Sequence, residues 1–223
     1  MREEKKAVIF DMDGVVVHTG VQHYAAWRRV FAEEGVDFGE EEFRATFGIR
    51  NPEILRRFLG EELSPQKVEE LGERKEDYYR ASVREAGLEP APGFLTLLQE
   101  LKRADFKIAL GTSGPQQNVE LIVEKLGLHH AFDAVVTGAD VKRGKPHPDT
   151  FLLAAERCGV APARCLVVED APAGLAAAKR AGMAAIGVTG TRDREALTEA
   201  DLVVDSLEKV SVALIQRLLR GRR

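Results

Sequence analysis

Short apolar runs alternate with helix-length segments along most of the chain. Each run has the length of a buried parallel strand and ends in polar residues or glycine. Several of the segments between the later runs begin at proline and end at glycine, as helices do. This alternation predicts an α/β fold built on a doubly wound parallel sheet. The predicted strands span residues 6–10, 106–110, 134–137, 165–168 and 184–188.

The segment between the first two predicted strands has helical patterns only. Trp27 and Phe31, for example, fall on one helical face, and Ser64-Pro65 is a typical helix start. An insertion of about 75 residues is too long for a simple crossover, and its return path, GLEPAPG, has the composition of a linker. We therefore predict an inserted all-helical cap domain joined to the sheet domain by two short connections. The cap would span residues 16–92, and the core would comprise residues 1–15 and 93–223.

Composition narrows the class of protein. The chain has 223 residues, 44% apolar residues and a net charge of −4, which favours a globular protein without the basic stripe of a nucleic-acid binder. Its apolar runs are shorter than the roughly 20 residues of a membrane span, and the N-terminus lacks a signal-peptide pattern. The two cysteines match no metal or disulfide pattern. We expect a cytoplasmic monomer with no nucleic-acid or membrane partner.

Four polar clusters fall at the ends of predicted strands. Ligands of open parallel sheets bind outside the carboxyl ends of the strands, so we expect these clusters to converge. Taken alone, each has an ordinary explanation: a turn, a surface lysine, or an acidic pair at a helix start. The clusters are DMDG at 11–14, GTSG at 111–114, GKP at 144–146 and ED at 169–170.

Carboxylates that converge repel one another and resist ionisation. A divalent cation resolves this conflict, and ligands that are all oxygen favour Mg²⁺ over zinc. Asp11 and Asp170 are the predicted ligands, with Glu169 beside them. Lys145 would add a fixed positive charge facing a phosphoryl group and the nucleophilic carboxylate.

Such a site is suited to phosphoryl transfer, which mainly requires positioning and charge stabilisation. Asp11 is the candidate nucleophile, and Asp13 is the candidate general acid and base. The hydroxyl of Thr112 and the backbone amides of Ser113 and Gly114 are candidates to bind phosphate oxygens.

The four clusters, in this order and spacing, resemble the motifs of the haloacid dehalogenase-like hydrolase superfamily. The helical cap after the first strand is similar to that of its β-phosphoglucomutase-like group. The resemblance implies a Rossmann-like core, Mg²⁺ and an aspartyl-phosphate intermediate. It also implies that Asp11 gives its carboxylate, and Asp13 its backbone carbonyl, to the metal. Asp13 marks phosphoryl transfer, since the dehalogenases differ there.

The cap matches that group only in part. His23, Trp27 and Lys75 align with similar residues of the mutases, and Lys75 with a lysine that reaches substrate phosphate. Arg50, in contrast, stands one position before the mutases' phosphate-binding arginine, where this chain has Asn51. Two further departures are His18, in place of an acidic residue, and Pro115, in place of a lysine.

These departures favour a phosphohydrolase for a small phosphorylated metabolite over a sugar-phosphate mutase, which needs a second phosphate site. A third hypothesis is a non-catalytic protein that binds a phosphorylated metabolite. His23, Arg50 and Lys75 are the candidate substrate contacts from the cap. The alternatives are an interfacial histidine at His23 and solvated side chains at Arg50 and Lys75. Trp27 is expected in the core of the cap.

Overall fold

The computed structural model describes residues 4–221, and its centre is a six-stranded parallel sheet. The strand order is β3-β2-β1-β4-β5-β6, so the sheet is doubly wound and its topological switch point lies between β1 and β4. The predicted Rossmann-like α/β fold with a helical cap is confirmed. The strands are β1 Ala7–Phe10, β2 Lys107–Gly111, β3 Ala134–Val136, β4 Cys165–Glu169, β5 Ala184–Val188 and β6 Leu202–Val204.

Helices cover both faces of the sheet because its strands are apolar on both sides. Val8 and Phe10 face a core formed with α5, α6 and α9, whereas Ala7 and Ile9 face a core formed with α7 and α8. All four side chains are completely buried. These helices are α5 Phe94–Arg103, α6 Gln116–Leu126, α7 Asp149–Cys158, α8 Pro172–Arg180 and α9 Val212–Arg220.

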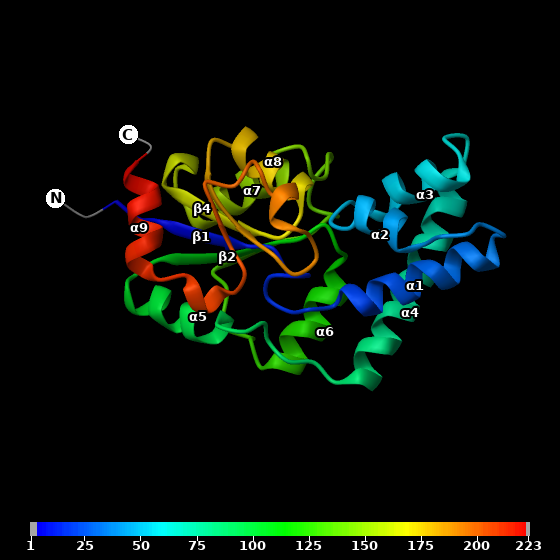
Figure 1. The fold of residues 1–223 in the computed structure, drawn as a ribbon, viewed down its shortest axis with the longest axis horizontal. Helices are drawn as coiled ribbons and strands as arrows, with labels where there is room; N and C mark the ends of the chain where they lie inside the picture. The colour runs from blue at the N-terminus through cyan, green and yellow to red at the C-terminus, as the bar shows by residue number, and fades with distance from the viewer. Residues whose placement is uncertain (1–3, 222–223) are drawn as a thin grey trace.

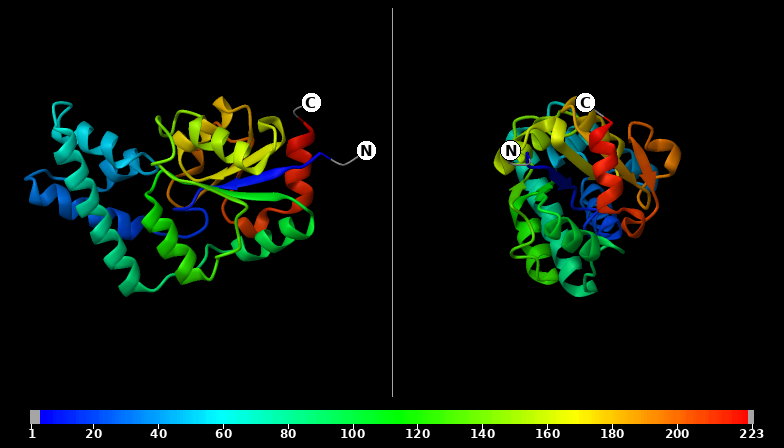
Figure 2. Two further views of the ribbon diagram at one scale, coloured as in Figure 1. Left: turned by 180° about the vertical axis from the view of Figure 1, so that it is seen from behind. Right: turned by 90° about the vertical axis from the view of Figure 1, so that its left-hand side faces the viewer.

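Four further helices form the cap, which has an apolar core of its own. Trp27, Phe31 and Phe38 pack with one another in this core, as expected for Trp27. The cap lies beyond the carboxyl ends of the strands, whereas α9 and the start of β1 lie at the opposite end of the described molecule (Figures 1 and 2). The cap helices are α1 Gly20–Glu33, α2 Glu40–Thr46, α3 Asn51–Leu59 and α4 Pro65–Ala86.

The two connections between cap and core run side by side. Val17 forms isolated bridges with Asp13 and with Pro90, and the Ala91 amide donates to the Val16 carbonyl at 2.8 Å. Two connecting segments that lie side by side are typical of a hinge between two parts of a protein. We propose that the cap turns here, and residues 16–92 remain our proposed limits for it. The ends of the proposed core, residues 1–3 and 222–223, lie outside the described residues.

Candidate active site

The register of the sheet brings the first and fourth clusters together. Phe10 of β1 pairs with Val168 of β4, and the Asp11 amide donates to the Val168 carbonyl at 2.9 Å. Asp11 therefore leaves the sheet beside Glu169 and Asp170, at the switch point where open α/β sheets bind ligands.

A buried lysine joins two of these carboxylates. Lys145 Nζ donates to Asp11 Oδ1 at 2.5 Å and to Glu169 Oε2 at 2.8 Å. Oxygens of Asp11, Glu169 and Asp170 all lie within 4.8 Å of one another. Burial works against the lysine's charge, but Asp11 and Glu169 outweigh it and raise the Lys145 pKa. The predicted convergence of these four residues is present in the structure.

The three acidic groups carry more negative charge than one lysine can balance. Burial, with Glu169 beside it, raises the Asp11 pKa to about 8 although Lys145 opposes the shift. Burial, together with Glu169 and Asp11, also raises the Asp170 pKa well above its ordinary value. Carboxylates held in this way gain stability in their charged form when a cation lies between them.

The residues present fit a divalent cation. Asp170 Oδ1 is buried and has no hydrogen-bond partner in the described structure, although buried oxygens are normally paired. Thr191 donates to the other oxygen, Oδ2, which holds the carboxylate in place. The backbone at Gly14 has φ of +94° and passes so close that a Cβ there would overlap the Asp170 carboxylate. An oxygen-only set of this kind suits a hard cation.

Asp13 is held by three side chains from the cap side of the site, all of which contact Oδ1. The hydroxyls of Thr19 and Tyr79 donate to this oxygen, and His23 Nε2 lies 3.1 Å from it. Burial works against ionisation of Asp13, but His23 and Thr19 outweigh burial and lower its pKa. Oδ2 takes no part in these contacts, and Asp13 lines the pocket between core and cap.

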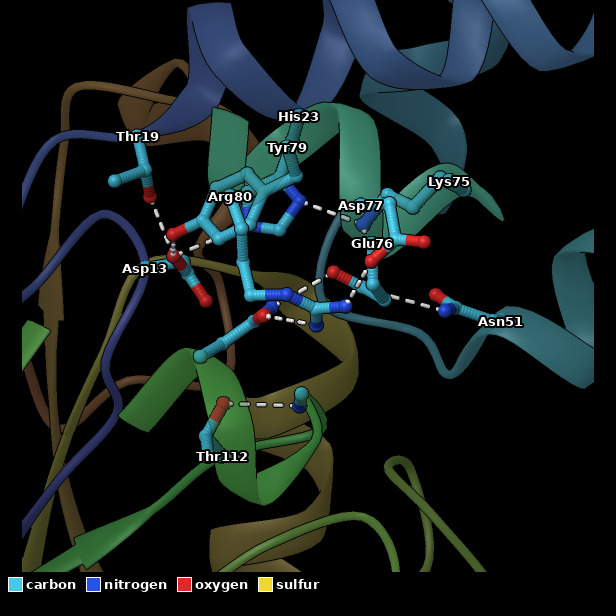
Figure 3. Close-up of polar contacts among 12 residues, drawn as sticks. Asp13, Thr19, His23, Asn51, Lys75, Glu76, Asp77, Tyr79, Arg80 and Thr112 are labelled. Carbon is cyan, nitrogen blue, oxygen red and sulfur yellow. Dashed lines mark hydrogen bonds and ion pairs between the residues drawn. The ribbon is translucent and has the colours of Figure 1, made fainter. Parts of the chain in front are cut away.

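His23 links Asp13 to Lys75 (Figure 3). Lys75 Nζ lies 2.8 Å from His23 Nδ1, and a lysine ammonium can only donate. Nδ1 therefore accepts from Lys75, and Nε2 is the ring nitrogen next to Asp13. The ring also stacks on Tyr79 with centroids 3.9 Å apart. His23 is thus both an interfacial histidine and a residue of the pocket lining.

Glu76 is a site residue that the sequence analysis missed. This residue lines the pocket next to Lys75 and is 4% exposed. The sequence did contain a signal, because Lys75 lies four residues after Leu71 and four before Tyr79, and Glu76 is its neighbour on this buried helical stripe. A charged pair on such a stripe indicates a buried polar contact.

The second cluster is only partly free to bind phosphate. Thr112 is buried, lines the pocket and accepts a hydrogen bond from the Gly114 amide at 3.0 Å. Ser113 also lines the pocket, but its hydroxyl donates to the Gly48 carbonyl of the cap at 2.8 Å. In this arrangement the Ser113 hydroxyl joins core and cap.

Arg50 is not brought to the pocket. Its guanidinium donates to the carbonyls of Val141 and Lys142, both at 3.3 Å, and to Glu53. The carbonyls of the core loop hold the guanidinium away from the pocket lining in this structure, and the substrate contact expected of Arg50 stays a prediction. Lys75, in contrast, is buried and lines the pocket, so the alternative of a solvated lysine is wrong.

The pocket between core and cap is small. The cavity that water-sized molecules can occupy has a volume of about 50 Å³. Cap and core contact each other beside it through the Ser113 hydroxyl and the Gly48 carbonyl, and we call this arrangement closed. The lining residues are Asp11, Asp13, His23, Trp27, Phe43, Thr46, Phe47, Gly48, Ile49, Asn51, Ile54, Lys75, Glu76, Thr112, Ser113 and Gly114.

The fold and this site define a class of enzyme, the capped α/β hydrolases with an acidic site at the switch point of the sheet. The family description "haloacid dehalogenase-like hydrolase" matches residues 5–182, and the chain belongs to this family. Within it, the chain falls in the phosphoglucomutase-like and phosphatase group, and it is a phosphatase. Along residues 4–221, no helix combines the length and apolar composition that a membrane span requires.

Three similar proteins illustrate this group. A validoxylamine A 7′-phosphate phosphatase of Streptomyces hygroscopicus subsp. limoneus is 33% identical over 92% of this chain and 95% of its own. A fructose-1-phosphate phosphatase of Escherichia coli is 35% identical, over 84% of this chain and 98% of its own. The crystal structure of a β-phosphoglucomutase from Clostridium difficile has a TM-score of 0.89 at 32% identity, over 97% of this chain and 98% of that one.

Proposed function

We propose that this phosphatase is a Mg²⁺-dependent phosphohydrolase that acts on a small phosphorylated sugar or polyol through an aspartyl-phosphate on Asp11. The observation that carries the proposal is the buried contact of Lys145 with Asp11 and Glu169, beside the unpartnered Asp170 Oδ1. The names of the relatives, one of which is a fructose-1-phosphate phosphatase, support the substrate class.

Asp11 is the proposed nucleophile. Lys145 holds its carboxylate in position at the end of β1 and balances part of the negative charge that gathers when a phosphoryl group approaches. The carboxylates of Asp11 and Asp170 and the backbone carbonyl of Asp13 would hold Mg²⁺, with Glu169 beside them. Bound there, the cation supplies further neutralisation of the phosphoryl oxygens.

Asp13 is the proposed general acid and base. As an Asp11 oxygen bonds to phosphorus and the bond to the leaving oxygen breaks, Asp13 gives that oxygen a proton. In the second step Asp13 takes a proton from a water molecule, whose oxygen attacks phosphorus and releases Asp11 and inorganic phosphate. The contacts of Thr19, His23 and Tyr79 fix Asp13 through Oδ1, which leaves Oδ2 for these transfers.

Opening and closing of the cap are part of the proposed reaction cycle. The pocket lies between cap and core, which also contact each other beside it, so we propose that the cap opens for binding and closes for chemistry. Ser113 bonding to Gly48 and Arg50 bonding to the carbonyls of Val141 and Lys142 are the contacts that would re-form on closure.

The testing experiment measures phosphate release from a panel of sugar phosphates, polyol phosphates, nucleotides and β-glucose 1-phosphate. Each assay is run with Mg²⁺ and with EDTA, for the wild type and for Asp11→Asn. Release that requires Mg²⁺ and is lost in the variant is the expected result. Conversion of β-glucose 1-phosphate to glucose 6-phosphate without free phosphate would instead identify a mutase, which the likeness to the β-phosphoglucomutase structure makes the second candidate.

A further inference from the structure

Three helices supply hydrogen-bond donors to one buried carboxylate, that of Glu76 in α4. Asn51 Nδ2 at the start of α3 donates to Oε1 at 2.7 Å, and Lys75 Nζ donates to the same oxygen at 2.9 Å. Asn118 Nδ2, from α6 of the core, donates to Oε2 at 2.7 Å. Figure 3 shows Asn51, Lys75 and Glu76 close together on the cap side of the site.

Glu76 is therefore a permanent anion of the closed pocket. Burial works against its charge, but Lys75, His23 and the two asparagine amides outweigh burial and lower the Glu76 pKa to about 2. Asn118 itself is completely buried and also accepts from Arg80 at 3.1 Å, so its amide is fixed with the NH₂ group towards Glu76. A protein carboxylate thus bridges cap and core.

The positive charge that the cap brings to the pocket is already paired with the Glu76 carboxylate. Lys75 is the one lysine or arginine among the pocket-lining residues of the described chain, and its ammonium contacts both Glu76 and His23. Arg50 points to the core loop instead. On the core side, Lys145 is held between Asp11 and Glu169.

We propose that Glu76 limits this enzyme to substrates with a single phosphoryl group and an uncharged, hydroxylated remainder. The inference rests on the proposed phosphohydrolase function and names the residue that sets its substrate selectivity. A second phosphoryl group near Lys75 meets the Glu76 carboxylate and has to separate Lys75 from it. Hydroxyl groups meet no such repulsion, because they can donate to the carboxylate oxygens or accept from amides.

The rest of the lining is consistent with an uncharged ligand. Trp27, Phe47 and Ile54 present apolar surface in the same pocket, and Asn51 adds an amide at its polar end. Apolar surface with a few placed polar groups is typical of sites for small molecules. The C–H faces of a sugar or polyol can pack on such rings while its hydroxyls reach the amide and carboxylate.

The experiment compares kcat/KM for fructose 1-phosphate, fructose 6-phosphate and fructose 1,6-bisphosphate with Mg²⁺ present. The selectivity ratio is kcat/KM of the better monophosphate divided by that of the bisphosphate. We expect a ratio of at least about 10 for the wild type and at least a tenfold fall of this ratio in Glu76→Gln, because a charge repulsion across a few ångströms is removed. Glu73→Gln is the matched control, since it removes an exposed carboxylate one turn earlier on α4 and should leave the ratio unchanged.

The outcomes distinguish a failure of the role proposed for Glu76 from a failure of the proposed phosphohydrolase function. A wild-type ratio near 1, with clear phosphate release, would overturn the role of Glu76 even if the Glu76→Gln variant does not fold. A folded Glu76→Gln enzyme, verified by circular dichroism, that keeps the wild-type ratio would overturn it as well. Absence of release from all three compounds and from the wider panel would instead reject the phosphohydrolase itself.

Discussion

Replacing Glu76 by glutamine should remove a stabilisation that depends on pH in a defined way. The Glu76 pKa is about 2 in the folded protein, against an ordinary value of 4.5 in an unfolded chain. The difference of 2.5 units corresponds to about 3 kcal/mol of folding free energy, at about 1.36 kcal/mol per unit. Since the folded pKa is the lower one, this stabilisation is complete above pH 4.5 and is lost as the pH falls through 2.

The two proteins should therefore differ most at neutral pH. Linkage gives a wild-type advantage of about 3 kcal/mol at pH 6 and about 1.4 kcal/mol at pH 3, reduced at both by the hydrogen bonds that glutamine keeps. Urea unfolding followed by circular dichroism at both pH values measures the difference directly, with EDTA present throughout. Glu73→Gln should change stability by less than about 0.5 kcal/mol at either pH. An equal penalty for Glu76→Gln at pH 6 and pH 3 would refute the reasoning.

Three other substitutions test the rest of the site. Gly14→Ala should lower the affinity for Mg²⁺ at least about tenfold in calorimetry. The new Cβ would overlap the Asp170 carboxylate, and the backbone φ of +94° costs a residue other than glycine about 1–2 kcal/mol. Unchanged affinity would contradict the proposed metal position. Asp13→Asn should reduce the rate of phosphate release about 10²–10⁴-fold, and a reduction below tenfold would argue against a proton-transfer role. Ser113→Ala loses the bond to Gly48, worth about 0.5–1.5 kcal/mol, and should raise KM about 2- to 10-fold while kcat stays within about twofold in steady-state assays. A fall in kcat alone would instead indicate a direct part in chemistry.

The local pattern of the sequence was sufficient for most of the sheet. Strands of the core are apolar on both faces and end in polar residues, so β1 and β4 and the positions of Asp11 and Asp170 after them could be predicted. β6 was missed because it has three residues, Leu202–Val204, of which two are only partly buried. Helices α2, α5 and α9 were missed where the analysis relied on proline and glycine as boundaries, since none of them begins at proline.

The residues of the site also differ in whether the local sequence pattern could place them. Asp11, Asp13, Lys145 and Asp170 could be placed because each follows a recognisable element or belongs to a motif. Periodicity fixes which face of an element a residue occupies, but it carries no information about the neighbour that the face will meet.

Only the tertiary structure decided the partners of the cap residues. It joined Glu76 to Asn118, which is 42 residues away in another domain, and it turned Arg50 towards carbonyls 91 and 92 residues away. It also assigned the Ser113 hydroxyl to the cap. The physical reason is that these bonds depend on how cap and core pack against each other, and this packing is set by contacts distant along the chain.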